Sequence, residues 1–233
     1  MQCLTDQPIS TRFYRGILRR LNRSGIPFLV GGACMMEHVA GIVRRTKDFD
    51  LHVKRQDVPR VFAALEAAGY QTEITFEHWL GKVFHGDLFV DVIFSSGNGI
   101  CTVDDEWFAH SHKGKVWGVP VRFCAPEEAI WSKAFVMERE RYDGADIAHL
   151  VLAAGERMDW QRLLRRFGPH WRVLFSHLIL FEFIYPDKRQ LVPEWLRQDL
   201  WAKANTERRE PPPKHPPCYG TLLSRVQYLH DLA

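Results

Sequence analysis

The chain has 233 residues, of which 46% are hydrophobic and 25% charged, a composition that excludes a disordered or fibrous protein. Its formal net charge of +3 is compatible with a nucleotide or RNA partner but does not require one. No signal peptide or membrane-spanning run is visible, and the five cysteines are widely spaced without a CxxC pair. We therefore expect a cytoplasmic protein with reduced cysteines and no membrane partner.

Helix and strand patterns alternate through the first half of the chain. Apolar residues at helical spacing mark the helices, and apolar runs or strict alternation mark the strands. Gly25 and Gly69 end two of the helices. In chain order we expect a helix over residues 10–22, a strand over 26–30, a helix over 33–39, a strand over 48–53, a helix over 58–68, and strands over 71–76, 82–85, 88–94 and 116–123. Gly118 and Pro120 break the last of these strands.

After Pro126 the pattern becomes helical, over residues 127–167 and again over 171–183. The proline-rich stretch EPPPKHPP, residues 210–217, has no capacity for a helix or a ladder. The fold class is therefore α/β (α+β), with a mixed sheet flanked by helices and then a helical region. We expect three parts, which are a mixed α/β domain over residues 1–125, a helical domain over 126–209, and a linker with a terminal segment over 210–233.

Two aspartates on one strand are the first functional lead. Residues 48–53, DFDLHV, alternate strictly, so Asp48 and Asp50 should point to one face. Their Cα atoms should then lie roughly 6–7 Å apart. At the end of a buried strand two like charges disfavour each other unless a cation lies between them. Mg²⁺ meets that need with one or two carboxylates and substrate phosphates.

A third aspartate, Asp91, lies in the apolar stretch LFVDVIF, residues 88–94. An unpaired acid is costly to bury there, and three carboxylates converge if this strand neighbours the first one. Three acids with two metal ions are the usual equipment of nucleotidyl transfer. The alternative is structural: the strand aspartates form surface ion pairs with the cations of residues 44–47, and Asp91 pairs with Lys82.

Gly31 and Gly32 follow a buried strand and open a helix. Backbone without side chains can approach a phosphate closely, and a helix N-terminus offers amide donors and a favourable dipole. The pair matches neither the dinucleotide fingerprint GxGxxG nor the P-loop GxxxxGK[ST]. It indicates a phosphate site followed by the DxD pair, which begins 48 − 32 = 16 positions after Gly32.

Together these features resemble the nucleotidyltransferase superfamily of DNA polymerase β type. The stretch GGACMMEHVAGIVRRTKDFDLHV, residues 31–53, is most similar to the bacterial branch that holds aminoglycoside and lincosamide nucleotidyltransferases and AbiEii-type toxins. The pattern there is Gly-Gly, a helix, Arg-Thr or Arg-Ser, and two aspartates separated by an apolar residue. The likeness extends through residues 90–92 to residues 125–133, about half of the chain.

The resemblance implies a role for each matching residue. Asp48, Asp50 and Asp91 would hold Mg²⁺ or Mn²⁺, and Asp91 would be a metal ligand or the base that deprotonates the acceptor. The acceptor would attack the α-phosphate in line, and pyrophosphate would leave. The triphosphate of an NTP, ATP by default, would be bound by Gly31, Gly32, Arg45, Thr46 and Lys133.

Residues 133–147, KAFVMERERYDGADI, are unusually rich in charge. One interpretation is a solvated helix face with ion pairs between residues four apart. The other follows from the resemblance: Lys133 faces the active site, while Arg141, Asp143 and Asp146 form a buried network that holds the helix. The two interpretations differ in whether these acids are exposed.

The sequence leaves the acceptor open. The leading function is Mg²⁺-dependent transfer of an NMP from an NTP to a small molecule, an RNA end or a protein. The basic charge and the arginine-rich first helix lean toward RNA or a protein. One alternative is a catalytically silent nucleotide-binding module or a component of a toxin–antitoxin pair. Another is an α/β protein in which DxD is an exposed cluster of salt bridges.

Overall fold

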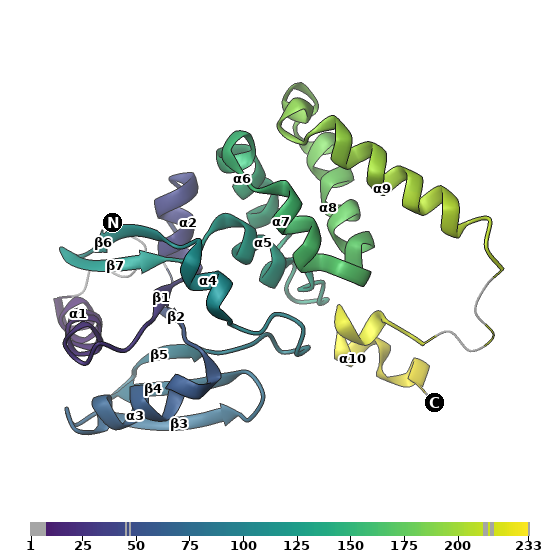
Figure 1. Ribbon diagram of the computed structural model, residues 1–233. Helices are drawn as coiled ribbons and strands as arrows, with labels where there is room; N and C mark the ends of the chain where they lie inside the picture. The colour runs from purple at the N-terminus through teal and green to yellow at the C-terminus, as the bar shows by residue number, and fades with distance from the viewer. Residues whose placement is uncertain (1–7, 45, 47, 212–213, 215–216, 233) are drawn as a thin grey trace. The chain divides into compact units, whose positions relative to one another are not determined.

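The computed structural model describes residues 8–44, 46, 48–211, 214 and 217–232. The chain divides into two compact units, Met1–Ala125 and Pro126–Ala233, each with its own core (Figure 1). Within the described residues, no helix combines the length and the apolar character that a membrane span needs.

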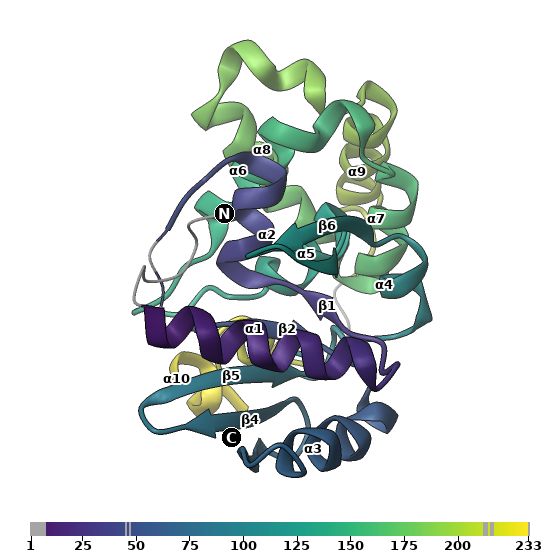
Figure 2. The ribbon, with the colours of Figure 1, turned by 90° about the vertical axis from the view of Figure 1, so that its left-hand side faces the viewer.

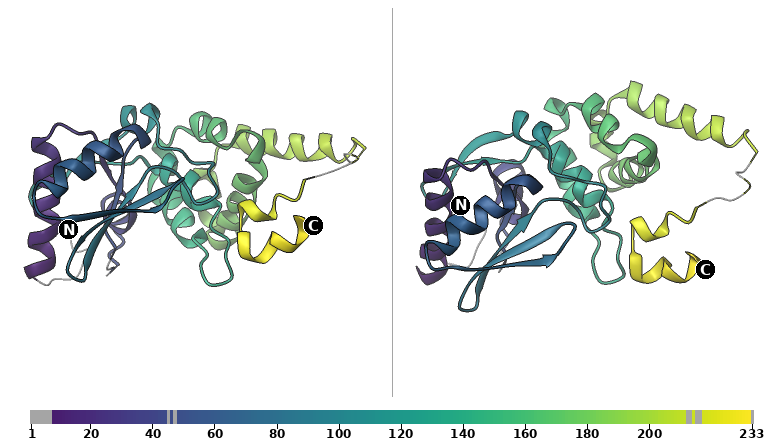
Figure 3. Two further views of the ribbon diagram at one scale, coloured as in Figure 1. Left: turned by 90° about the horizontal axis from the view of Figure 1, so that it is seen from below. Right: turned by 60° about the horizontal axis from the view of Figure 1, so that its bottom comes forward.

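A seven-stranded sheet forms the centre of the first unit. Its strands are β1 (Leu29–Val30), β2 (Asp50–His52), β3 (Gln71–Phe76), β4 (Leu80–His85), β5 (Leu88–Ile93), β6 (His112–Val116) and β7 (Val119–Phe123). The order across the sheet is β3-β4-β5-β2-β1-β7-β6, with β3, β4 and β5 as an antiparallel meander at one edge (Figure 3). β1 pairs in parallel with β7, and β2 with β5, so the sheet is mixed, as the sequence predicts.

Helices flank this sheet. They are α1 (Pro8–Arg23), α2 (Gly32–Ala40), α3 (Val58–Glu66) and the short α4 (Asp105–Ala109). α1 crosses one face of the sheet (Figure 2), because its apolar residues recur every three or four positions and form one stripe. Phe13, Ile17 and Leu21 of that stripe are buried, and the Tyr14 ring packs on Phe49 with 5.3 Å between the centroids.

A hairpin replaces the single strand that the sequence predicts over residues 116–123. Trp117 and Gly118 have φ angles of 47° and 77°, and two central residues with positive φ define the tight turn that joins β6 to β7. The Trp117 ring stacks on Tyr14 with 5.7 Å between the centroids, which stabilises a backbone conformation that bulky residues rarely adopt. The break that the sequence predicts at Gly118 is therefore the turn of a hairpin, whereas Pro120 lies within β7 and does not break it.

Three cysteines of the described residues are free thiols. Cys101 and Cys124 are buried, and Cys218 is partly exposed. The expectation of reduced cysteines is confirmed at these three positions.

The second unit is helical, as predicted. Its α-helices are α5 (Pro126–Ala134), α6 (Gly144–Ala154), α7 (Trp160–Phe167), α8 (Trp171–Ile184), α9 (Glu194–Glu207) and α10 (Arg225–Tyr228). Helix α9 lies in a stretch that the sequence leaves unassigned. The predicted helical run over residues 127–167 is interrupted, because Met137 and Tyr142 pair as an isolated bridge between α5 and α6. The interpretation of this segment as a solvated helix face is wrong for residues 135–143, which form a loop.

The terminal segment of the chain packs on that loop. The Met137 N–H donates a hydrogen bond of 3.3 Å to the Leu223 carbonyl, and the fully buried Ser224 hydroxyl donates to Glu138. The Tyr219 ring lies edge-on to His170, with 6.2 Å between the centroids. This segment therefore belongs to the helical unit, which settles where a stretch without an obvious partner in the sequence is placed.

Ion pairs are buried where α5 meets α7. Arg162 is 3% exposed, lies 2.9 Å from Glu127, and also pairs with the fully buried Glu128. Burial raises the pKa of Glu128 above its ordinary value, and the nearby guanidinium groups of Arg162 and Arg166 oppose that effect. Removing one partner of such a pair leaves an uncompensated charge in the core.

Replacing Arg162 should therefore destabilise the second unit strongly. We expect Arg162→Met to lower the free energy of unfolding by about 3–5 kcal/mol. Arg165→Met, on the exposed side of the same helix, should change it by less than about 0.5 kcal/mol. Urea denaturation followed by circular dichroism measures both, and equal stability of the two variants would contradict the role of the buried pair.

Candidate active site

A row of polar residues crosses the middle of the sheet in the first unit. The parallel pairing of β2 with β5 sets Asp50 opposite Asp91. The antiparallel pairing of β4 with β5 sets Lys82 opposite Asp91 on its other side. Residues paired in register share a face of the sheet. The strands that carry Asp50 and Asp91 are therefore neighbours, with the two acids side by side.

Asp50 lies on the face of the sheet that α1 does not cover. Phe49 precedes it and packs on Tyr14 of α1, and successive side chains of a strand point to opposite faces. His52 shares the face of Asp50 and is 8% exposed, with its ring 4.9 Å from that of Trp107. His52 thus packs against Trp107 on the same face of the sheet as Asp50.

The Gly31-Gly32 turn packs directly against these side chains. The Gly31 N–H donates a hydrogen bond of 3.0 Å to the Asp50 carbonyl, and a Cβ at Gly31 would overlap the His52 ring. Gly32 has a φ of 51°, and a Cβ there would overlap the Asp50 carboxylate. Only glycine lets that carboxylate reach the N-terminus of α2, where the helix dipole favours a negative charge.

The Gly31 amide is thus already engaged in holding β2. Phosphate binding through the amides of this turn stays a prediction, and it falls to Gly32 and the first turn of α2. The Asp50 carboxylate at the same helix end means that a triphosphate here would meet a negative charge. A cation between the two would remove that repulsion.

Lys82 holds Asp91 in an ion pair of 2.5 Å, with 21% and 16% of the two side chains exposed. Burial raises the pKa of Asp91 above its ordinary value, the hydrogen bond and charge of Lys82 oppose this, and the charge of Asp48 adds to the increase. Asp48 therefore lies within electrostatic reach of Asp91. Lys82 is the partner that the structural alternative predicts for Asp91.

Asp48 itself lies just before β2 and is exposed. Its backbone N–H donates a hydrogen bond of 3.1 Å to the Thr46 hydroxyl, which fixes the turn that leads into the strand. The predicted phosphate contact of Thr46 stays a prediction. Arg45, for which the sequence predicts the same role, lies outside the described residues.

The acids fit a divalent cation by donor type, because carboxylate oxygens are what Mg²⁺ prefers. Asp50 and Asp91 come from adjacent strands, whose backbones are about 4.8 Å apart. Over the described part of the chain, however, no three His, Cys, Asp or Glu side chains are already gathered so as to hold a metal. For three carboxylates to bind one ion, the aspartate side chains would have to change rotamer, and the ion pair between Lys82 and Asp91 would have to break.

Lys133, in the second unit, takes part in a network of ion pairs. Its Nζ lies 3.0 Å from Asp143 and 2.8 Å from Asp146, and Arg141 donates to Asp143 at 3.0 Å. Burial acts to lower the pKa of Lys133, but the two carboxylates outweigh it and raise that pKa above its ordinary value. Of the buried network expected of residues 141–146, the two acids are largely buried and pair with Lys133, whereas the Arg141 side chain is 68% exposed. Binding of nucleotide by Lys133 stays a prediction.

Among the sequence-based predictions, Lys82 is named only in the structural alternative, as the partner of Asp91. The signal was available in the hairpin that turns at Gly86 and Asp87, because a two-residue turn sets His85 opposite Leu88. Counting back three residues on one strand and forward three on the other then pairs residue 82 with residue 91. Turn arithmetic thus predicts the neighbour of the third acid.

A mixed sheet in which a Gly-Gly turn meets acids on two adjacent strands defines a nucleotidyltransferase-like core. A family model described as "uncharacterised nucleotidyltransferase" matches residues 10–173, more than half of the chain. The chain therefore belongs to this nucleotidyltransferase family. No match is found among proteins with curated descriptions.

Several solved structures are similar to the chain. The antibiotic-resistance factor ANT(2'')-Ia is 19% identical, with 72% of this chain and 96% of its own covered and a TM-score of 0.49. The lincosamide antibiotic adenylyltransferase LnuA is 16% identical, with coverages of 63% and 96% and a TM-score of 0.44. JHP933 from Helicobacter pylori is 13% identical, with coverages of 88% and 98% and a TM-score of 0.45.

Alanine variants of Gly32 and Gly41, which both have positive φ, test the contact between Gly32 and Asp50. Gly41, at the C-terminal end, has a φ of 68° and open space where a Cβ would lie. Gly41→Ala should cost about 1–2 kcal/mol of unfolding free energy from backbone strain alone. Gly32→Ala should cost about 1–3 kcal/mol more, because its Cβ must displace the Asp50 carboxylate. Urea denaturation measures the difference, and equal losses would rule out the contact.

Removing Lys82 should raise the pKa of Asp91 further, because Lys82 opposes the effect of burial. An acid whose folded-state pKa exceeds its unfolded value reduces stability as pH rises between the two values. Lys82→Met should therefore lose stability relative to the wild type as pH rises through that window, and keep most of it at lower pH. Carbon-13 NMR titration of the aspartate carboxyls measures the pKa, with the exposed Lys113→Met as control. An Asp91 that titrates identically in both variants would contradict the ion pair.

Proposed function

We propose that this protein transfers a nucleoside monophosphate from an NTP to an acceptor, with Mg²⁺ or Mn²⁺ held by Asp48, Asp50 and Asp91. The observation that carries the proposal is the Asp50 carboxylate in contact with Gly32 at the N-terminus of α2, with Asp91 in register beside it. A phosphate-binding helix end and paired metal-ligand acids thus meet at one point. Because all these residues precede Pro126, we propose residues 1–125 as the catalytic domain.

Each residue has a separate task. The amides at the start of α2 bind the triphosphate and orient its α-phosphate. Asp91 either completes the set of carboxylates around the cation or takes the proton of the acceptor hydroxyl. A divalent cation, when bound, neutralises phosphate charge and the charge that develops in the transition state. The acceptor oxygen bonds to the α-phosphorus, the bond from that phosphorus to the bridging oxygen breaks, and pyrophosphate leaves.

Lys82 competes with the cation for Asp91 in this scheme. Its ammonium group neutralises Asp91 while the nucleotide is absent. A divalent cation held by the acids would supply that positive charge instead, and Lys82 would then be available to a phosphate. The acceptor classes in this proposal are a small molecule, an RNA end and a protein, and ATP is the nucleotide to try first.

A second candidate function is nucleotide binding without catalysis. It is favoured by the Lys82–Asp91 pair and by the lack of three gathered ligands among the described residues. The two functions differ in a simple respect. A silent module binds an NTP with Mn²⁺ but transfers nothing to any acceptor class.

Transfer of radiolabel from α-³²P-labelled NTPs to small-molecule, RNA and protein pools tests the proposal. We expect labelled product with the wild type and Mg²⁺, none with EDTA, and a rate about 10²–10⁴-fold lower for Asp91→Asn. Asp87→Asn, the same change at an exposed turn position of the first unit, should keep the wild-type rate. NTP binding without product in any pool would favour the silent module, and full activity of Asp91→Asn would contradict the assignment.

A further inference from the structure

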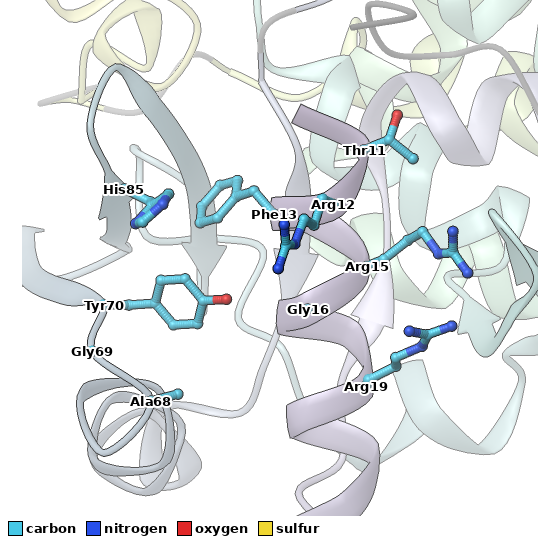
Figure 4. A pocket seen from close by; sticks show the side chains of 10 residues that line it. All are labelled: Thr11, Arg12, Phe13, Arg15, Gly16, Arg19, Ala68, Gly69, Tyr70 and His85. Atoms are coloured by element: carbon cyan, nitrogen blue, oxygen red, sulfur yellow. The ribbon is translucent and has the colours of Figure 1, made fainter. Parts of the chain in front are cut away.

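A hollow of about 940 Å³ lies along α1 in the first unit, and the proposed reaction makes no use of it. It lies on the helix that covers the face of the sheet opposite to Asp50. Figure 4 shows Phe13 projecting toward Tyr70 and His85 on one side of α1. Arg15 and Arg19 project from the other side, with Arg12 between the two groups (Figure 4). The hollow therefore combines an aromatic side with a cationic side.

The cationic side is a row along the helix. Arg12, Arg15 and Arg19 are three and four residues apart, so they lie about 4.5 and 6 Å apart along the axis. Within the described residues, none of the three makes an ion pair or a side-chain hydrogen bond, and the Nε of Arg15 is shielded from solvent without an acceptor. By contrast, Arg20 donates its Nε to the Ala64 carbonyl at 3.1 Å. Arg12 and Arg19 are exposed, so their guanidinium groups are accessible to an anion.

The aromatic side is a stack that ends in solvent. The buried Phe13 ring lies parallel to the His85 ring, with 5.7 Å between the centroids and 16° between the planes. Tyr70 meets the Phe13 ring edge-on at 5.6 Å. Tyr70 also meets the His85 ring edge-on, with 5.8 Å between the centroids. His85 is nevertheless exposed, so its ring is accessible to a further planar group. Base–aromatic stacking on such platforms tolerates any base.

Gly16 brings the two sides together. A Cβ at this position would lie 2.9 Å from the Tyr70 hydroxyl, so glycine lets Tyr70 lie against the middle of the helix. Glycine inside a helix costs about 0.5–1 kcal/mol relative to alanine. The chain thus tolerates a weaker helix where the aromatic side meets the row of arginines.

Evenly spaced guanidinium groups next to an open ring face match a ligand with repeated phosphates and accessible bases. A duplex hides the faces of its bases, and a run of acidic residues carries no aromatic ring to stack on His85. We propose that this surface binds single-stranded nucleic acid, with successive phosphates on Arg12, Arg15 and Arg19 and a base stacked on His85. The site is separate from the acids, so it stands whether or not nucleotidyl transfer is found.

Fluorescence anisotropy with the full-length protein and a fluorescein-labelled twelve-nucleotide oligouridylate tests the proposal, in EDTA and without NTP. The triple variant Arg12→Gln/Arg15→Gln/Arg19→Gln should bind at least tenfold more weakly. The slope of log K against log salt concentration should fall by about 2, since each phosphate contact on a single strand contributes about 0.7. The control Arg139→Gln/Arg208→Gln/Arg209→Gln loses the same charge from exposed arginines of the second unit and should bind as the wild type does.

His85→Ala tests the stacked base separately. It should weaken binding about fivefold or more while leaving the salt slope unchanged, because only a ring contact is lost. Circular dichroism confirms that each variant is folded. An oligothymidylate of equal length distinguishes RNA from DNA, and tight binding of either supports the site.

Three results would overturn the proposal. They are equal losses in the two triple variants, wild-type affinity of His85→Ala, and displacement of the oligonucleotide by a duplex or by polyglutamate at equal concentration. Equal losses would show that the weaker binding follows from net charge alone, not from the position of the arginines. The last would indicate a double-stranded or protein partner instead.

Discussion

The centre of the first unit depends on one close approach, that of the Asp50 carboxylate to the backbone of Gly32. It is possible only because no Cβ lies there, and it sets a negative charge at the positive end of α2. The neighbouring Gly31, which directly follows β1, donates its N–H to the Asp50 carbonyl. Strand, turn and helix are thus fixed relative to one another by a pair of residues without side chains.

Charge balance follows from that arrangement. Asp50 is compensated by the helix dipole, and Asp91 by Lys82 across the next strand. The sheet can therefore carry adjacent acids in its middle without a bound cation. Both sources of positive charge are weaker than a divalent cation. A cation bound at the acids could therefore take over from the helix dipole and from the flexible Lys82 ammonium group. The proposed function requires this property, because the fold must be stable without the cation and still able to bind it.

The sequence patterns predicted the features that depend on residues close together in the chain. The strict alternation around Asp50, the apolar stretch around Asp91 and the glycine pair all lie where the sequence placed them, and the hairpin register even supplies Lys82. The misses come from contacts between distant residues. Trp117 adopts a positive φ because its ring packs on Tyr14, about a hundred positions earlier in the sequence. The break after α5 is held by the terminal segment, whose sequence offers no hint of that partner.

The pairing of β2 with β5 also governs how the first unit assembles. Asp50 and Asp91 are 91 − 50 = 41 residues apart, and the chain between them forms α3 and a hairpin before it returns. Parallel pairing over such a separation requires the closure of a long loop, which is a slow step in folding. During synthesis the two acids stay apart until β5 has left the ribosome. Any opening that detaches β5 from β2 then abolishes their pairing in a single event, although every helix can remain intact.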